Sequence, residues 1–85
     1  MKDLRILGVL VSNRIKDAVL VQDTLTKFGC SIKTRLGLHE VTEDLCTNYG
    51  LLLLELTGDK TEWDKLEIAL KKIEGLEVQK MDFEV

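Results

Sequence analysis

Hydrophobic and polar residues alternate along the chain with two different periods, and the change of period marks the predicted elements. The stretch from Leu4 to Ser12 is apolar and rich in branched side chains, which is typical of a β-strand. A helix capped by Ser12 or Asn13 is then predicted to run to Phe28, where Gly29 can end it. Its expected buried stripe has helical spacing and consists of Ile15, Ala18, Val19, Gln22, Leu25 and Phe28, with Val21 at its margin.

The second half of the chain repeats this pattern. Residues 31–38 alternate strictly, which predicts a strand with one face in water. The segment 49–57, "YGLLLLELT", predicts a third strand, and Gly58 and Asp59 turn the chain into a second helix that Thr61 can cap. The buried face of that helix is expected to hold Trp63, Leu66, Leu70 and Ile73. Gly75 ends the helix, and residues 76–83 predict the last strand.

The order strand, helix, strand, strand, helix, strand defines the expected fold. It predicts an α+β protein with a ferredoxin-like βαββαβ sandwich, in which two helices cover one face of an antiparallel four-stranded sheet. The first and third strands should be central, because both carry apolar residues on both faces. Without proline, low-complexity runs or a linker, residues 1–85 are expected to form a single domain.

The four consecutive leucines of the third strand raise the question of what covers the sheet face away from the helices. In the first strand one face takes Leu4, Ile6 and Leu10, and the other takes Leu7, Val9 and Val11. In the third strand one face takes Leu51 and Leu53, and the other takes Leu52, Leu54 and Leu56. Whichever set meets the helices, the remaining one would form an exposed patch of several hundred Å², which soluble monomers rarely show.

A second subunit laid against this face is the economical solution, so we expect a homodimer or a tetramer. The predicted interface consists of Leu7, Val9, Val11, Leu52 and Leu54. The alternative is a monomer in which a loop or the C-terminal tail covers the sheet.

Charge and composition narrow the classes of function. The net charge is −3 and the isoelectric point about 5.1, which disfavours direct nucleic-acid binding. The uninterrupted apolar run from Ile6 to Val11 is too short for a membrane span or a signal peptide. Cys30 and Cys46 fit no disulfide framework, so we expect reduced thiols in a cytoplasmic protein.

Two loops carry the residues that could bind a ligand. The start of the first helix offers Ser12, Asn13 and Arg14, where free backbone N–H groups and a cation favour an anion. The end of the second strand adds Gly37, Leu38 and His39, and we predict that these six residues form a ligand site near a subunit junction. Neither loop pairs a nucleophile with a base, so no enzymatic activity and no cofactor are expected.

His39 and Cys46 also have the donor types that transition metals prefer. Because no tight spacing fixes a coordination geometry, a solvated acidic loop explains them as well, and no metal ligands are assigned.

Four stretches carry a resemblance to a known family: "ILGVLVSNR", "FGCSIKTRLGLHE", "NYGLLLLELTGD" and "KKIEGLEVQKMDF". With these, nearly the whole chain resembles the iron-only hydrogenase system regulators, which have an ACT-like, ferredoxin-like fold. Its shape is also similar to the C-terminal domain of nickel-responsive regulators, although Tyr49 and Gly50 stand where that domain has metal ligands. The resemblance implies a cytoplasmic regulatory or ligand-sensing protein connected with [FeFe]-hydrogenase systems.

The sequence therefore predicts a small homo-oligomeric regulatory module that binds a small-molecule effector or a partner protein. The alternatives are a metal-responsive sensor that uses His39 and Cys46, and a structural interaction module that contributes only its oligomeric surface.

Overall fold

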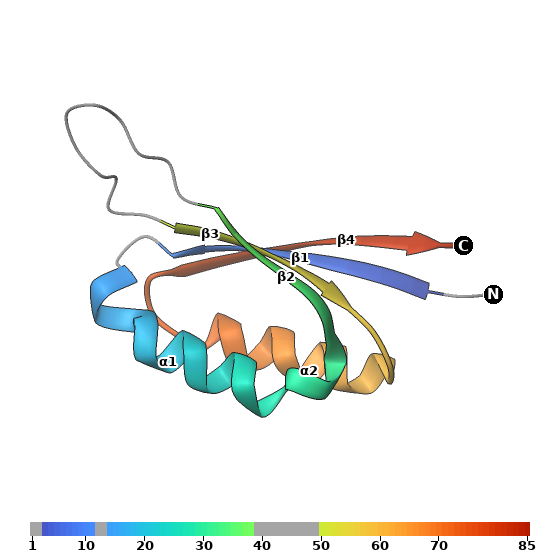
Figure 1. The fold of residues 1–85 in the computed structure, drawn as a ribbon, viewed down its shortest axis with the longest axis horizontal. Coiled ribbons are helices and arrows are strands. Elements are labelled where there is room, and N and C mark those ends of the chain that lie inside the picture. The colour runs from blue at the N-terminus through green and yellow to red at the C-terminus, as the bar shows by residue number, and fades with distance from the viewer. Residues whose placement is uncertain (1–2, 12–13, 39–49) are drawn as a thin grey trace.

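The computed structural model describes residues 3–11, 14–38 and 50–85, with the backbone alone at residues 14–17 and 38. The elements follow the predicted order (Figure 1). They are β1 (Asp3–Val11), α1 (Arg14–Lys27), a short 3-10 helix (Gly29–Ser31), β2 (Ile32–Leu38), β3 (Gly50–Leu56), α2 (Lys60–Lys71) and β4 (Leu76–Glu84).

The four strands form one antiparallel sheet in the order β2-β3-β1-β4, and both helices lie on one face of it (Figure 1). This confirms the α+β, ferredoxin-like βαββαβ sandwich with β1 and β3 at its centre. Strand β4 pairs with β1 without a shift over its whole length, from Asp3 opposite Glu84 to Val11 opposite Leu76. The other edge strand, β2, is less regular, because its register with β3 shifts between Ile32 and Thr34.

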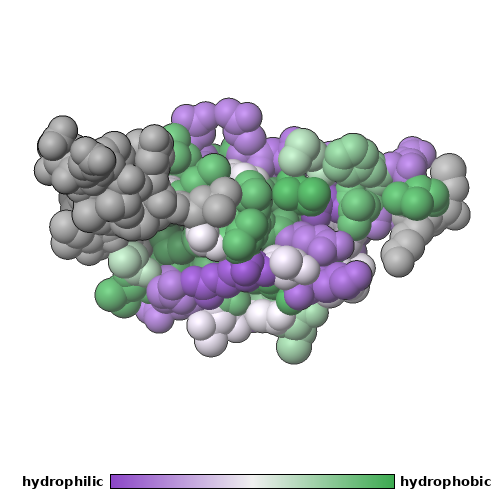
Figure 2. Space-filling model, turned by 45° about the horizontal axis from the view of Figure 1, so that its top comes forward, coloured by the Kyte–Doolittle hydropathy of each residue, from purple (hydrophilic) through white to green (hydrophobic). Residues whose placement is uncertain are grey.

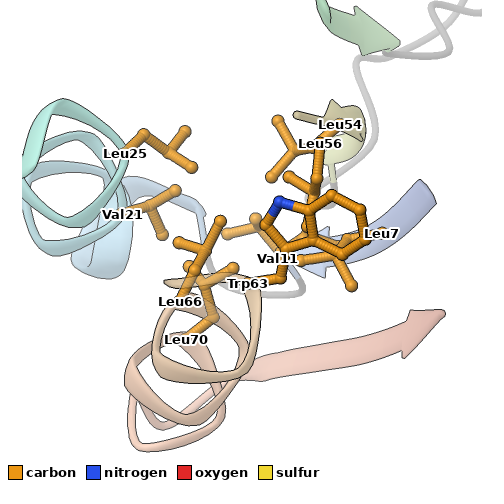
Figure 3. Close-up of a cluster of buried hydrophobic side chains, with 10 residues drawn as sticks. Leu7, Val11, Val21, Leu25, Leu54, Leu56, Trp63, Leu66 and Leu70 are labelled. Carbon is orange, nitrogen blue, oxygen red and sulfur yellow. The ribbon is translucent and has the colours of Figure 1, made fainter. Parts of the chain in front are cut away.

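The core fills the space between the sheet and the helices (Figure 3). Its fully buried side chains include Leu7, Val9 and Leu54 from the central strands. Leu66 and Leu70 are buried from α2, together with Trp63, whose Nε1 donates to the carbonyl oxygen of Thr57 at 2.8 Å. The predicted stripe of the second helix is thereby confirmed, since Ile73 also packs against this cluster.

The residues predicted to form the oligomer interface lie on the face of the sheet that the helices cover. Leu7, Val9, Val11 and Leu54 are 0–5% exposed and form the core beneath the helices, while Leu52 packs against it partly buried. Alternation fixes which residues share a face, but it does not say which face the helices cover when both are apolar.

The stripe predicted for the first helix was also displaced. Val21 and Leu25 are buried with Phe28 packed beside them, whereas Val19 is 69% exposed. Helix α2 is capped by Asp59 rather than Thr61, since the Asp59 carboxylate accepts a 2.9 Å hydrogen bond from the Thr61 backbone N–H. Glycine suits the turns at Gly58 and Gly75, whose φ angles are 81° and 92°.

Candidate functional site

The most distinctive surface of the protein is the sheet face opposite the helices, here called the open face. Every second side chain of each strand points to this face. Strand pairing brings these side chains together, because residues directly opposite each other point to the same side of the sheet. Its apolar members are Leu4, Ile6, Leu10, Leu36, Leu51, Leu53, Met81 and Phe83. In Figure 2 hydrophobic side chains gather over the sheet, with polar ones between them. All four strands therefore contribute to one largely apolar surface.

The polar residues of the open face are already paired with each other. Thr34 donates to Glu55 at 2.9 Å on the β2 side, and Gln79 donates to Glu77 at 2.6 Å on β4. Covering this face would therefore cost less than covering unpaired polar groups, because these side chains keep a hydrogen-bond partner within the subunit.

Gly8 lies in the middle of the open face and leaves a shallow hollow of about 240 Å³ that Leu10, Leu51, Glu77 and Gln79 also line. A Cβ at this position would meet only ordinary contacts, the nearest being the Gln79 carbonyl oxygen at 3.9 Å. Packing within the subunit does not require the glycine. The hollow is suited to receive a side chain from outside.

The size of the open face can be estimated from sheet geometry. The strands are seven or nine residues long, so at about 3.3 Å per residue and about 4.8 Å between strands the sheet covers roughly 500 Å². The largest apolar patches of soluble monomers cover about 300–600 Å² and are often functional, so the open face is of comparable size even with its polar side chains included. Two such faces together come near the lower end of specific protein–protein interfaces.

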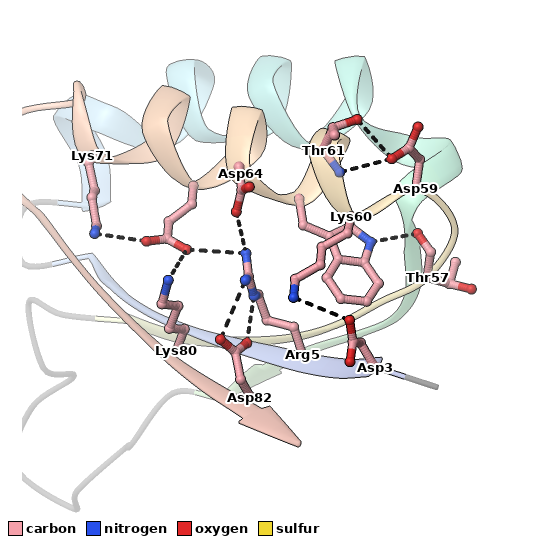
Figure 4. A network of polar contacts seen from close by, with 12 residues as sticks. Asp3, Arg5, Thr57, Asp59, Lys60, Thr61, Asp64, Lys71, Lys80 and Asp82 are labelled. Carbon is pink, nitrogen blue, oxygen red and sulfur yellow. Dashed lines mark hydrogen bonds and ion pairs between the residues drawn. The ribbon is translucent and has the colours of Figure 1, made fainter. Parts of the chain in front are cut away.

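A second group of interacting side chains surrounds Arg5, on the helix side of the sheet (Figure 4). Arg5 is 3% exposed, and its guanidinium donates to Asp82 at 2.6 Å and to Asp64 at 2.8 Å. It also lies 5.6 Å from the centre of the Trp63 ring. Hydrogen bonds from Arg5 hold the pKa of both Asp64 and Asp82 below the ordinary value of 3.8.

Glu67 closes this cluster on α2. It is 8% exposed, with Lys71 at 2.9 Å from one carboxylate oxygen and both Arg5 and Lys80 at 3.7 Å from the other. Three cations and three carboxylates from β1, β4 and α2 therefore balance each other. The cluster ties β4 and α2 to the central strand, and we assign it a structural role. Sequence reasoning missed it because Arg5 was treated only as an interruption of an apolar strand.

The predicted ligand site lies partly outside the described residues, which exclude Ser12, Asn13 and His39. Of its other members, Arg14 begins α1, and Gly37 and Leu38 end β2. Both β1 and β2 are antiparallel to β3, so they end at the same end of the sheet, with β3 between them. The fold thus brings the two halves of the predicted site to one end of the sheet, two strand spacings apart.

Cys46, the other candidate metal ligand, also lies outside the described residues. Within residues 3–11, 14–38 and 50–85, no group of three or more His, Cys, Asp or Glu side chains could hold a metal ion. Cys30 is a free, exposed thiol. In the same ranges, neither helix is long and apolar enough to cross a membrane.

Comparison with known proteins identifies structural relatives but no family. No family model and no curated protein matches the chain. Among solved structures, the uncharacterised protein TM1266 of Thermotoga maritima is 26% identical, with a TM-score of 0.81 over 98% of this chain and 100% of that one. A second similar structure is CPII of Thiomonas intermedia K12, a nitrogen regulatory PII-like protein bound to ADP, AMP and bicarbonate. It is 11% identical, with a TM-score of 0.67 over 99% of this chain and 93% of that one.

A third similar structure is a DUF3240 family protein of Shewanella baltica, 17% identical with a TM-score of 0.52, covering 95% of this chain and 90% of that one. Together these likenesses support the ferredoxin-like fold.

Proposed function

We propose that this chain is a non-catalytic, cytoplasmic regulatory module that assembles as a homo-oligomer through its open face and binds a small-molecule effector or a partner protein. The open face is the observation that carries the proposal. A largely apolar face on a sheet of roughly 500 Å² is costly to leave in water, since each fully buried apolar side chain contributes about 1.5–3 kcal/mol. A second copy of the same face offers matching size and apolar character. Isologous pairing of this kind is the commonest form of assembly.

The effector would bind at the end of the sheet where Arg14 begins α1 and where β2 ends at Leu38. A cation near a helix N-terminus favours an anionic ligand. Because the PII-like CPII was found with ADP, AMP and bicarbonate, ADP is a reasonable first effector to test.

The link to iron-only hydrogenase systems rests on the sequence resemblance alone. The stretches "ILGVLVSNR" and "NYGLLLLELTGD", which support it, belong mainly to β1 and β3. In this proposal the protein responds to its effector within such a system and passes the response on through its oligomer.

Native mass spectrometry of the purified protein, without chelator and then with added ADP, tests the proposal. We expect a dimer or tetramer, and a retained or added mass would identify the effector. A monomer at micromolar concentration would refute assembly through the open face. A stable oligomer that takes up neither ADP nor a purified ligand would favour the purely structural interaction module instead.

A further inference from the structure

The helix side of the protein carries a groove that the proposed assembly leaves uncovered. It lies between the C-terminal end of α1 and the outer surface of α2 and has a volume of about 560 Å³. Its apolar lining consists of Phe28, Ile68 and Ala69. Ile68 is 56% exposed, although it lies on a helix whose other large apolar side chains, Trp63 among them, are buried in the core.

The groove follows a second stripe of α2. Lys65, Ile68, Ala69 and Lys72 recur at the spacing of one helix face. Single exposed apolar residues are common on protein surfaces and need no explanation. Here, however, the exposed isoleucine lies beside two further apolar side chains in one hollow, with lysines on either side of it along the helix.

The charge of the groove is opposite to that of the protein. Lys27, Lys65 and Lys72 line it against the single carboxylate of Glu62, a local charge of +2 on a chain whose net charge is −3. Glu62 is 3.6 Å from Lys65. In the described part of the chain, Lys27 and Lys72 make no ion pair, and Lys27 instead lies 5.9 Å from the centre of the Phe28 ring.

We propose that this groove binds an acidic amphipathic helix of a partner protein. One apolar side chain of the partner would cover Ile68, and carboxylates on the same face would pair with Lys27 and Lys72. The positive charge of the groove favours an acidic partner and disfavours a basic one. The inference rests on the proposed function, for which it supplies the surface that contacts the partner protein.

The probe is a fluorescein-labelled peptide of about 15 residues with leucine and glutamate at helical spacing on one face. Fluorescence anisotropy measures its binding to the full-length protein. We expect saturable binding that weakens as salt rises, because exposed charge pairs are screened. A peptide of the same composition with its leucines dispersed around the helix should bind at least about tenfold more weakly, since it cannot cover Ile68 while pairing with the lysines.

Two matched pairs of variants separate the groove from the rest of the surface. Lys27→Glu with Lys72→Glu should weaken peptide binding at least about tenfold, whereas Lys33→Glu with Lys60→Glu makes the same change in net charge outside the groove and should leave most of the binding. Ile68→Ser should weaken binding, and Val19→Ser, at the 69% exposed position on α1, should not.

The inference is overturned if the peptide does not bind, if the dispersed peptide binds equally well, or if both lysine pairs behave alike. Native mass spectrometry of the Lys27→Glu and Lys72→Glu double variant keeps this test separate from the proposed function. If the oligomer is unchanged and peptide binding does not depend on the groove residues, only the proposal that the groove binds a partner is refuted. A monomeric wild-type protein that still binds the peptide refutes the assembly and leaves the groove in place.

Discussion

Replacing Met81 with glutamate tests whether the open face is the assembly surface. Met81 lies opposite Ile6 on the open face and is 52% exposed, so it contributes little to the core. Fully burying such a side chain is worth about 1.5–3 kcal/mol, so covering its exposed half in an oligomer contributes about 1 kcal/mol. In a two-fold symmetric interface the contact occurs twice, which makes about 2 kcal/mol.

Losing about 2 kcal/mol of the free energy of dimerisation raises the dimer dissociation constant roughly 30-fold. The new carboxylate adds to this, because it would be buried in the interface without a partner. We therefore expect Met81→Glu to shift the protein towards monomer across a concentration series in light scattering after size exclusion, while circular dichroism stays that of the folded protein. Leu36→Glu, at the 50% exposed position on β2, should act in the same way.

The matched control is Val19→Glu, which places the same charge at a position 69% exposed on the helix side. It should leave the oligomer intact. If Met81→Glu and Leu36→Glu left the subunit number unchanged, or if Val19→Glu dissociated the protein equally well, the assignment of the interface to the open face would be wrong.

Three further outcomes follow from the structure. Leu54→Ala should lower the free energy of unfolding by about 2–5 kcal/mol in urea titrations, because this side chain is fully buried, and a loss below about 1 kcal/mol would contradict its place in the core. Arg5 depresses the pKa of the two aspartates beside it, so their ion pairs stabilise the fold above the ordinary pKa of 3.8, and this contribution is lost as the pH falls below that value. The melting temperature of Arg5→Met should accordingly fall less between pH 6 and pH 3 than that of the wild type. If the two melting temperatures fell in parallel, these ion pairs would not be a cause of the acid destabilisation. Gly8→Ala should fold normally, since a Cβ there meets only ordinary contacts. It should nevertheless alter the oligomer by partly filling the central hollow, and an oligomer of unchanged affinity would place Gly8 outside the interface.

Local pattern was sufficient to predict most of the fold. The strands, the helices and their order follow from hydrophobic period and from turn residues such as Gly58 and Gly75. The central positions of β1 and β3 follow from apolar residues on both faces of each. The stripe of α2 was predicted because its largest apolar side chains recur at the spacing of one helix face. Helix α1 has apolar residues on several sides, and Val19 was assigned to the core although it is exposed.

The candidate sites were harder to predict. Sequence reasoning predicted an exposed apolar sheet face but chose the wrong one of the two. Alternation alone does not show which face the helices cover when both faces are apolar. Arg5 could have distinguished the two faces, because it points to the same face of β1 as Leu7 and Val9. Its partners Asp64 and Asp82 are 59 and 77 residues away, however, and nothing local indicates that they meet.

The sequence by itself determined which residues are neighbours on each strand and helix, since that depends only on backbone periods of two and about 3.6 residues. It also determined that one apolar sheet face would remain after the helices had packed. Only the tertiary structure decided which face that is, because the choice depends on how α1 and α2 cross over the sheet. The tertiary structure likewise brought Arg5 to its carboxylates and set lysines from two helices around Ile68, since these contacts join residues far apart along the chain.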